Sequence, residues 1–349
     1  MSTFFLLLIL LLGFLITFQI AKASEYVGVL KGEKKNFEQH NRINGFLMIV
    51  FLVLGLIGIY WCNELFRGKI LGESASKLGE DQDRMLYITI AITGVVFVAT
   101  QILLFWFAYK YQYSEKRQAH YFPHDNRLEV IWTVVPAIAL TVLVGFGLFY
   151  WFRITGEAPQ DALQVEITGK QFGWIFRYPG KDQVFGKKYY QNISDKDNNQ
   201  LGLIWDDAAT HDDIVVSNEM YCVVNKPLKL IIGSRDVIHD VGLAYFRQKM
   251  DAVPGTPTTL WFTPKFTTAE MKKKLGNPDF VYEISCDQMC GRGHYTMRGI
   301  ITVVSEDEYK LWLAKQKSNY ASVMGDKAPA APAGAAPTDS TKTTAANIK

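Results

Sequence analysis

The sequence has few cysteines, little net charge and no motif for covalent haem attachment. Its 349 residues include only four cysteines at uneven spacing, which excludes a small disulfide-stapled scaffold. The formal net charge of +3 gives no indication of nucleic-acid binding. The sequence Cys-x2-Cys-His is absent, so no c-type haem is attached through it. Long apolar runs are also missing after residue 153, so any membrane span must come earlier.

Four apolar runs before residue 153 are long enough to cross a membrane. A spanning helix needs about 20 mostly apolar residues, and a buried soluble helix would normally show a polar face, which these runs lack. They divide into an N-terminal pair with a basic connection at 1–62 and a helical hairpin at 87–152. The four predicted spans are Phe4–Ile20, Gly45–Cys62, Tyr87–Tyr109 and Leu128–Phe152.

Lysine and arginine cluster in two of the connecting segments. Residues 21–44 and 110–127 are basic, whereas residues 63–86 mix acids with bases. Basic segments stay on the cytoplasmic side, so we expect the N-terminus and the part after the fourth span to lie outside. The sequence Ala-Lys-Ala at 21–23 resembles a signal-peptidase site and leaves cleavage open. A retained helix is favoured, because cleavage would put the basic segments on the wrong side.

After residue 163 the pattern changes to short, alternating apolar runs separated by turns. Many strands at short spacing are typical of an all-β sandwich or barrel. We expect a soluble domain at 153–318, with a polar excursion at 180–213 and a short helix at 267–275. The tail at 319–349 has too few apolar residues to pack and is expected to be disordered. The segments predicted to hold strands are 163–179, 213–241, 258–264, 279–286 and 298–305.

The strongest chemical signal is a group of metal-binding residue types near the C-terminal end of the soluble domain. Cys286, Cys290, His294 and Met297 lie within a short glycine-rich segment, and His239 follows an apolar run upstream. Thiolate, thioether and imidazole together favour copper over hard cations. Zinc with two cysteines and two histidines remains open, although the methionine would then have no role. A disulfide would explain neither histidine, and a blue-copper site needs one cysteine rather than two.

This segment resembles the dinuclear copper (CuA) motif of cytochrome c oxidase subunit II. The resemblance rests on the spacing Cys-x3-Cys-x3-His-x2-Met and on Asp-Val-Ile-His at 236–239. It extends to Lys-Met-Asp-Ala-Val-Pro-Gly at 249–255 and to Leu-Glu-Val-Ile-Trp-Thr-Val-Val-Pro at 128–136. These matches follow the family order from residue 87 to about residue 309. They imply a cupredoxin-like sandwich behind a membrane-helical anchor.

The resemblance also implies a function and a set of ligands. Electrons would arrive from a c-type cytochrome and leave for a haem in subunit I, where dioxygen reduction and proton pumping would occur. The expected location is a bacterial inner membrane, with the copper domain on the periplasmic side and other oxidase subunits as partners. Two cysteines would bridge two copper ions, and each histidine would complete one of them. The implied ligands are His239, Cys286, the backbone carbonyl of Gln288, Cys290, His294 and, as a weak axial ligand, Met297.

Two positions depart from the family pattern. Gln288 replaces a glutamate that helps to bind magnesium at the subunit I interface, and a neutral amide is a poorer ligand for a hard cation, so magnesium is in doubt. The usual Gln-Trp-x-Trp is here Gln-Phe-Gly-Trp at 171–174. Phe172 thus occupies the position where electrons enter, and Trp174 the second aromatic position. Modified electron uptake, with a donor held in a fixed complex, and simple packing of Phe172 both remain open.

The anchor raises two further questions. Glu129 lies at the inner end of the last predicted span, where a carboxylate is costly unless it is solvated or faces a polar path. The resemblance implies the entrance of a proton channel, and solvation at the membrane interface is the alternative. The two N-terminal spans exceed the two that are usual in the family. They dock another subunit or simply add anchoring.

Four other classes of protein were weighed against this interpretation. A quinol-oxidase subunit II shares the anchor and sandwich but lacks the copper ligands. Nitrous oxide reductase has a similar copper loop, but on a soluble enzyme with a large catalytic domain. A copper-delivery protein would not need Glu129 or the aromatic stretch. The fourth class is an anchor domain stabilised by zinc. Identifying the bound metal would distinguish it from the copper proteins.

Overall fold

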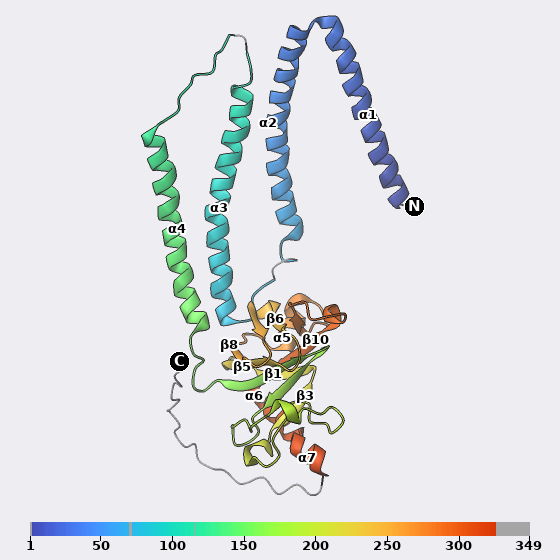
Figure 1. Ribbon diagram of the computed structural model, residues 1–349, viewed down its shortest axis with the longest axis vertical. Coiled ribbons are helices and arrows are strands. Elements are labelled where there is room, and N and C mark those ends of the chain that lie inside the picture. The colour runs from blue at the N-terminus through green and yellow to red at the C-terminus, as the bar shows by residue number, and fades with distance from the viewer. Residues whose placement is uncertain (1, 70–71, 115, 326–349) are drawn as a thin grey trace. The chain divides into compact units, whose positions relative to one another are not determined.

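The computed structural model describes residues 2–69, 72–114 and 116–325 (Figure 1). It divides into two units. One unit comprises residues 1–71 and 87–141, and the other comprises residues 72–86 and 142–349. The second unit contains the β-sandwich together with the helix ends that join it, so the site and its surroundings can be described within one unit.

Long helices form the N-terminal half, as predicted. They are α1 (Ser2–Lys31), α2 (Glu33–Phe66), α3 (Lys77–Lys110) and α4 (Asn126–Thr155). Within the described residues, three helices are long and apolar enough to cross a membrane: 35–66 of α2, α3 and α4. Three candidate spans are therefore found among the described residues, whereas four were predicted. The remaining span, Phe4–Ile20, lies in α1, and several of its side chains fall outside the described residues.

The segment between the first two predicted spans differs from the expectation of a basic loop. Residues 21–44 are helical except at Gly32, where α1 ends and α2 begins one residue later. Gly32 has φ of +82°, a conformation that glycine adopts without steric cost. Apolar spacing alone does not show how far a helix continues beyond the membrane, because lysine and glutamate are also good helix formers.

The soluble half is a sandwich of two five-stranded sheets, which confirms the predicted fold class. One sheet has the order β3-β2-β1-β5-β8 and the other β4-β10-β9-β6-β7. β1 runs parallel to β5, and β10 runs parallel to β4. The strands are β1 (Leu163–Lys170), β2 (Gly173–Tyr178), β3 (Ile214–Ser217), β4 (Glu219–Val223), β5 (Leu228–Ser234), β6 (His239–Leu243), β7 (Gln248–Ala252), β8 (Thr258–Phe262), β9 (Tyr282–Cys286) and β10 (Arg298–Val304).

Three helices accompany the sheets. α5 (Thr268–Leu275) matches the predicted short helix, and α6 (Glu306–Lys315) packs Trp312 against Tyr221 with ring centroids 4.5 Å apart. α7 (Asn319–Met324) lies within the tail that was expected to be disordered. Its Tyr320 stacks on His211 at 4.0 Å, so the ordered chain continues past residue 318. The rest of that tail, residues 326–349, lies outside the described residues.

The excursion between β2 and β3 is irregular, as predicted, and is held by a buried ionic cluster. Arg177 of β2 pairs with Glu166 at 3.1 Å and with Asp213, and it donates to the carbonyl of Gly186. Lys188 also contacts Glu166. A buried charge is tolerated only when it is paired and hydrogen-bonded. This cluster therefore ties residues 180–213 to the sheet, at a position separate from the cysteine loop.

Candidate metal centre

Two neighbouring strands bring the distant parts of the candidate site together. His239 is the first residue of β6 and Cys286 is the last residue of β9. These strands are antiparallel neighbours in register Val241 opposite Cys286. The histidine, 47 residues upstream of Cys286, therefore lies beside the thiol. The remaining candidates come from the loop between β9 and β10, which contains a 3-10 turn at His294–Thr296.

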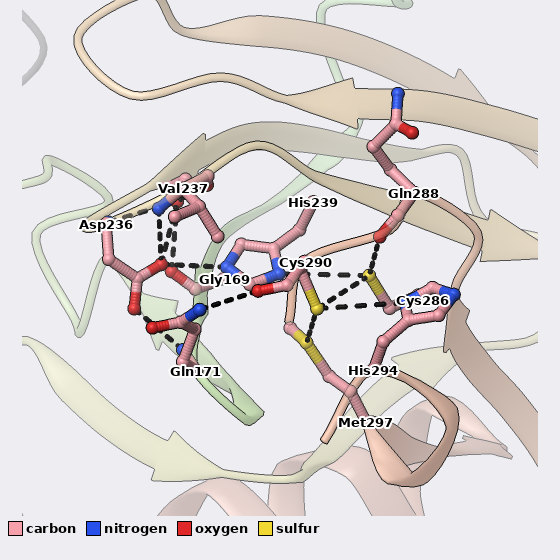
Figure 2. A network of polar contacts seen from close by, with 11 residues as sticks. Gly169, Gln171, Asp236, Val237, His239, Cys286, Gln288, Cys290, His294 and Met297 are labelled. Atoms are coloured by element: carbon pink, nitrogen blue, oxygen red, sulfur yellow. Dashed lines mark hydrogen bonds and ion pairs between the residues drawn. The ribbon is translucent and has the colours of Figure 1, made fainter. Parts of the chain in front are cut away.

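The two cysteine sulfurs lie at the centre of the site (Figure 2). Their Sγ atoms are 3.7 Å apart, and both cysteines are free thiols. Nδ1 of His239 lies 3.8 Å from the Sγ of Cys286, and Nδ1 of His294 lies 3.7 Å from the Sγ of Cys290. Each sulfur thus has its own imidazole, on opposite sides of the sulfur pair.

Two weaker donors complete this arrangement. The backbone carbonyl oxygen of Gln288 accepts a contact from the Cys286 thiol at 3.2 Å, whereas its amide side chain points away from the sulfurs (Figure 2). The Met297 sulfur lies 3.9 Å from the Sγ of Cys290. One weak donor therefore stands at each thiol. All six residues that the sequence predicted as ligands are brought into one cluster.

The donor set is typical of a site for a soft metal ion. The donor atoms of His239, Cys286 and Cys290 all lie within 4.8 Å of one another, and His294 stands outside this group. A closed zinc site would draw both histidines and both thiols around one point. Here one imidazole nitrogen contacts each sulfur. Thiolate, imidazole and thioether are ligands typical of copper.

Four of the six candidate ligand residues are shielded from water by the sandwich. His239, both cysteines and Met297 are buried. Burial, together with the neighbouring Cys286 thiol, raises the pKa of Cys290 to about 11. Without a metal this thiol is therefore protonated at neutral pH. Metal binding must displace its proton.

A second layer of residues orients His239. Oδ1 of Asp236 accepts a hydrogen bond from Nε2 of His239 at 2.8 Å. The same carboxylate accepts from the backbone N–H of Gln171 and of Val237, each at 2.7 Å. Burial alone would raise the pKa of Asp236, but these hydrogen bonds hold it below its ordinary value. A carboxylate acceptor at Nε2 orients the ring so that Nδ1 faces the Cys286 sulfur.

Gln171 connects the two ligand-bearing segments. Its backbone N–H reaches Asp236, and its side-chain Nε2 donates to the carbonyl oxygen of Cys290 at 2.6 Å (Figure 2). It lies in the turn between β1 and β2, so the opposite sheet holds the cysteine loop in place. The sequence showed Gln171 and Asp236 only as parts of motifs. Their bridging role depends on contacts 65 and 119 residues apart.

The two aromatic candidates have different environments. Trp174 is 0% exposed, and its ring lies 6.1 Å from the His239 ring, so a partner protein does not touch it directly. Phe172 is 42% exposed and lies on the cysteine loop. A Cβ added at Gly293 would come within 2.5 Å of its ring. Glu129, the remaining candidate, lies in the first turn of α4, in the other unit.

Comparison with known proteins agrees with this geometry. The family model for the transmembrane domain of cytochrome c oxidase subunit II matches residues 68–149, and the model for its periplasmic domain matches residues 163–304. The alternative cytochrome c oxidase subunit 2 of Bradyrhizobium diazoefficiens is 35% identical over 70% of this chain and 83% of its own length. The chain belongs to the cytochrome c oxidase subunit II family.

Two further proteins of this family are similar to the chain. Cytochrome c oxidase subunit 2 of Cereibacter sphaeroides is 25% identical over 71% of this chain and 79% of its own length. The solved periplasmic domain of subunit II from Bradyrhizobium japonicum is 26% identical and covers 45% of this chain and 95% of its own, with a TM-score of 0.31. Membership makes this chain a membrane-anchored component of an oxidoreductase complex, with an electron-transfer domain of the periplasmic type.

Proposed function

We propose that this subunit takes up electrons from a c-type cytochrome at a dinuclear copper centre and passes them to a haem in subunit I. Dioxygen reduction to water and proton pumping would take place in subunit I. The observation that carries the proposal is the pair of thiols 3.7 Å apart, each with its own imidazole. When bound, two copper ions would supply a one-electron redox centre.

The residues of this chain hold such a centre with little freedom to move. Cys286 and Cys290 would bridge the metals, and His239 and His294 would each bind one of them. Met297 and the carbonyl of Gln288 would act as weak axial ligands. Because four of these side chains are buried and the loop is held by Gln171, the ligands would move little when the centre gains or loses an electron. A rigid site keeps the energetic cost of electron transfer low.

We place electron uptake at Phe172. Its exposed ring lies directly on the cysteine loop, and further exposed apolar side chains stand next to the candidate ligands in sequence. An apolar collar of this kind suits a tight contact with the donor. Trp174 would serve behind it as packing for His239 rather than as a contact surface. The other collar residues are Val237, Ile238, Met289 and Tyr295.

The proposal also assigns roles to the membrane helices. The helices before residue 63 add anchoring beyond the hairpin at 87–152, and the copper domain faces the periplasm of a bacterial inner membrane. Glu129 would mark the entrance of a proton path into subunit I. No magnesium site is proposed at Gln288, because a neutral amide is a poor ligand for that ion.

Metal stoichiometry tests the central proposal. The full-length chain in detergent is loaded with copper or with zinc, and bound metal is counted by elemental analysis. Two copper ions per chain are expected, falling to fewer than two in a Cys290→Ser variant. One zinc ion bound in preference to copper would support the zinc-stabilised anchor instead. Copper bound by the wild type and Cys290→Ser alike would also contradict the proposal.

A further inference from the structure

A cavity of about 880 Å³ lies where the ends of two membrane helices meet the sandwich. Its walls come from the last turns of α4, the first turns of α3 and the strands β5, β7 and β8, all within one unit. Ion pairs fix these walls to one another. Arg153 of α4 pairs with Asp81 of α3 at 3.0 Å, and Arg247 pairs with Asp83 at 2.8 Å. The copper ligands do not line this cavity.

Two hydrogen-bond donors of the cavity wall have no acceptor among the described residues. Gln248 is only 7% exposed, yet its Nε2 has no hydrogen-bond partner among the described residues. A buried amide donor left unpaired is unfavourable, so a missing acceptor is indicated. Lys229 also lines the cavity and forms no ion pair within the part of the chain that the structure describes. The other two basic residues of the lining have carboxylate partners, since Arg247 pairs with Asp83 and Lys249 lies 3.7 Å from Asp287.

Aromatic and aliphatic side chains form the rest of the wall. Tyr150 and Trp151 come from the end of α4, and Trp261 of β8 donates from its indole nitrogen to the carbonyl of Gly156 at 2.9 Å. Tryptophan and tyrosine concentrate at the level of lipid headgroups. Ile154 adds an aliphatic surface beside them. The cavity therefore combines donors from the strands with apolar contacts from the end of α4 and from Trp261.

We propose that this cavity binds an anionic glycerophospholipid of the outer leaflet. Lys229 and Gln248 hold the phosphate, since together they supply a cation and an unpaired donor. The aromatic side chains contact the glycerol and the first part of the acyl chains. A free phosphate ion would fill only a small part of about 880 Å³ and would leave the apolar wall uncovered. The proposal does not rest on the copper centre.

Native mass spectrometry of the full-length, delipidated chain in a neutral detergent tests this site. Phosphatidylglycerol and phosphatidylcholine are titrated separately, and bound lipid is counted. One phosphatidylglycerol per chain is expected to bind in preference to phosphatidylcholine. Lys229→Glu should weaken phosphatidylglycerol binding about tenfold, because a charge near an anionic headgroup is reversed. Gln248→Leu, which removes the donor at similar size, should weaken it less.

The matched control is Lys273→Glu, an exposed lysine on α5 that does not line the cavity. It should leave lipid binding unchanged. Equal binding of both lipids, or wild-type affinity in Lys229→Glu, would overturn the proposal. So would displacement of the lipid by inorganic phosphate at equal concentration, which would indicate a site for free anions. The copper spectrum of Lys229→Glu should remain that of the wild type, which separates this test from that of the proposed function.

Discussion

Asp236 accepts a 2.8 Å hydrogen bond from His239, on the ring nitrogen opposite the one that faces the Cys286 sulfur. Three hydrogen bonds keep this carboxylate ionised despite partial burial, and they hold its pKa below the ordinary value. This carboxylate therefore orients the imidazole so that its other nitrogen faces the Cys286 sulfur. Such outer partners are commonly worth 10–100-fold in metal affinity or activity.

Replacing Asp236 should loosen copper without dismantling the domain. We expect Asp236→Ala to speed copper transfer to a chelator by about 10–100-fold. Asp236→Asn should have a smaller effect, because an amide oxygen still accepts from the imidazole. The measurement is the rate of copper loss from the loaded full-length chain. Identical rates in the two variants and the wild type would show that Asp236 does not position His239.

Gln171 should affect the cysteine loop more than a comparable glutamine nearby. Gln171→Ala removes the 2.6 Å hydrogen bond to the Cys290 carbonyl and should cost about 0.5–1.5 kcal/mol of unfolding free energy. It should also alter the copper spectrum. Gln200, which accepts from Lys170 at 2.9 Å, is the control, since it contacts no ligand. Matching copper spectra in Gln171→Ala and Gln200→Ala would contradict a clamping role.

Phe172 should matter for a protein donor but not for a small one. We expect Phe172→Ala to lower turnover with the physiological cytochrome at least tenfold, while reduction of the copper by a small chemical reductant continues at the wild-type rate. Stopped-flow reduction with each donor makes the comparison. Val184→Ala, at another exposed apolar side chain, is the control. If Phe172→Ala leaves turnover with the cytochrome unchanged, Phe172 is not the site of electron uptake. Its role would then be packing against Gly293.

The cysteines should separate into structural and ligand roles. Cys222 is fully buried in the core, and burial raises its pKa to about 12, so it should resist alkylation of the folded chain at pH 8. Cys222→Ser should reduce stability, because a hydroxyl in an apolar core lacks a partner, but should keep the copper. Metal analysis and thermal unfolding of Cys222→Ser and Cys290→Ser provide the measurement. Copper loss in Cys222→Ser at a temperature where the domain is folded would contradict this division.

Much of the sandwich follows from local patterns. Alternating apolar residues predicted most strands, and α5 was predicted at 267–275, where a capping box joins Thr267 and Glu270. β7 was missed because Gln248–Ala252 carries mostly polar side chains and is a strand only through its pairing with β6. α6 was missed although Ser305 and Glu308 form a capping box just before it. That signal was readable in the sequence.

Several features of the site could not be predicted from sequence patterns. Soft-ligand chemistry and family spacing identified six candidate ligands, but the division of histidines between the two thiols depends on the pairing of β6 with β9. The contrast between exposed Phe172 and buried Trp174 also required the structure. Phe172 lies in the turn between β1 and β2, whereas Trp174 lies within β2. Strand alternation therefore does not assign the face on which Phe172 lies.

Electron paramagnetic resonance of the copper-loaded full-length chain tests the central claim most directly. Two thiols shared between two metals predict a hyperfine pattern from one unpaired electron distributed equally over two copper nuclei. His239→Ala should make that distribution unequal, because only one metal loses its imidazole. A mononuclear copper spectrum from the wild type, or no copper uptake at all, would contradict the account.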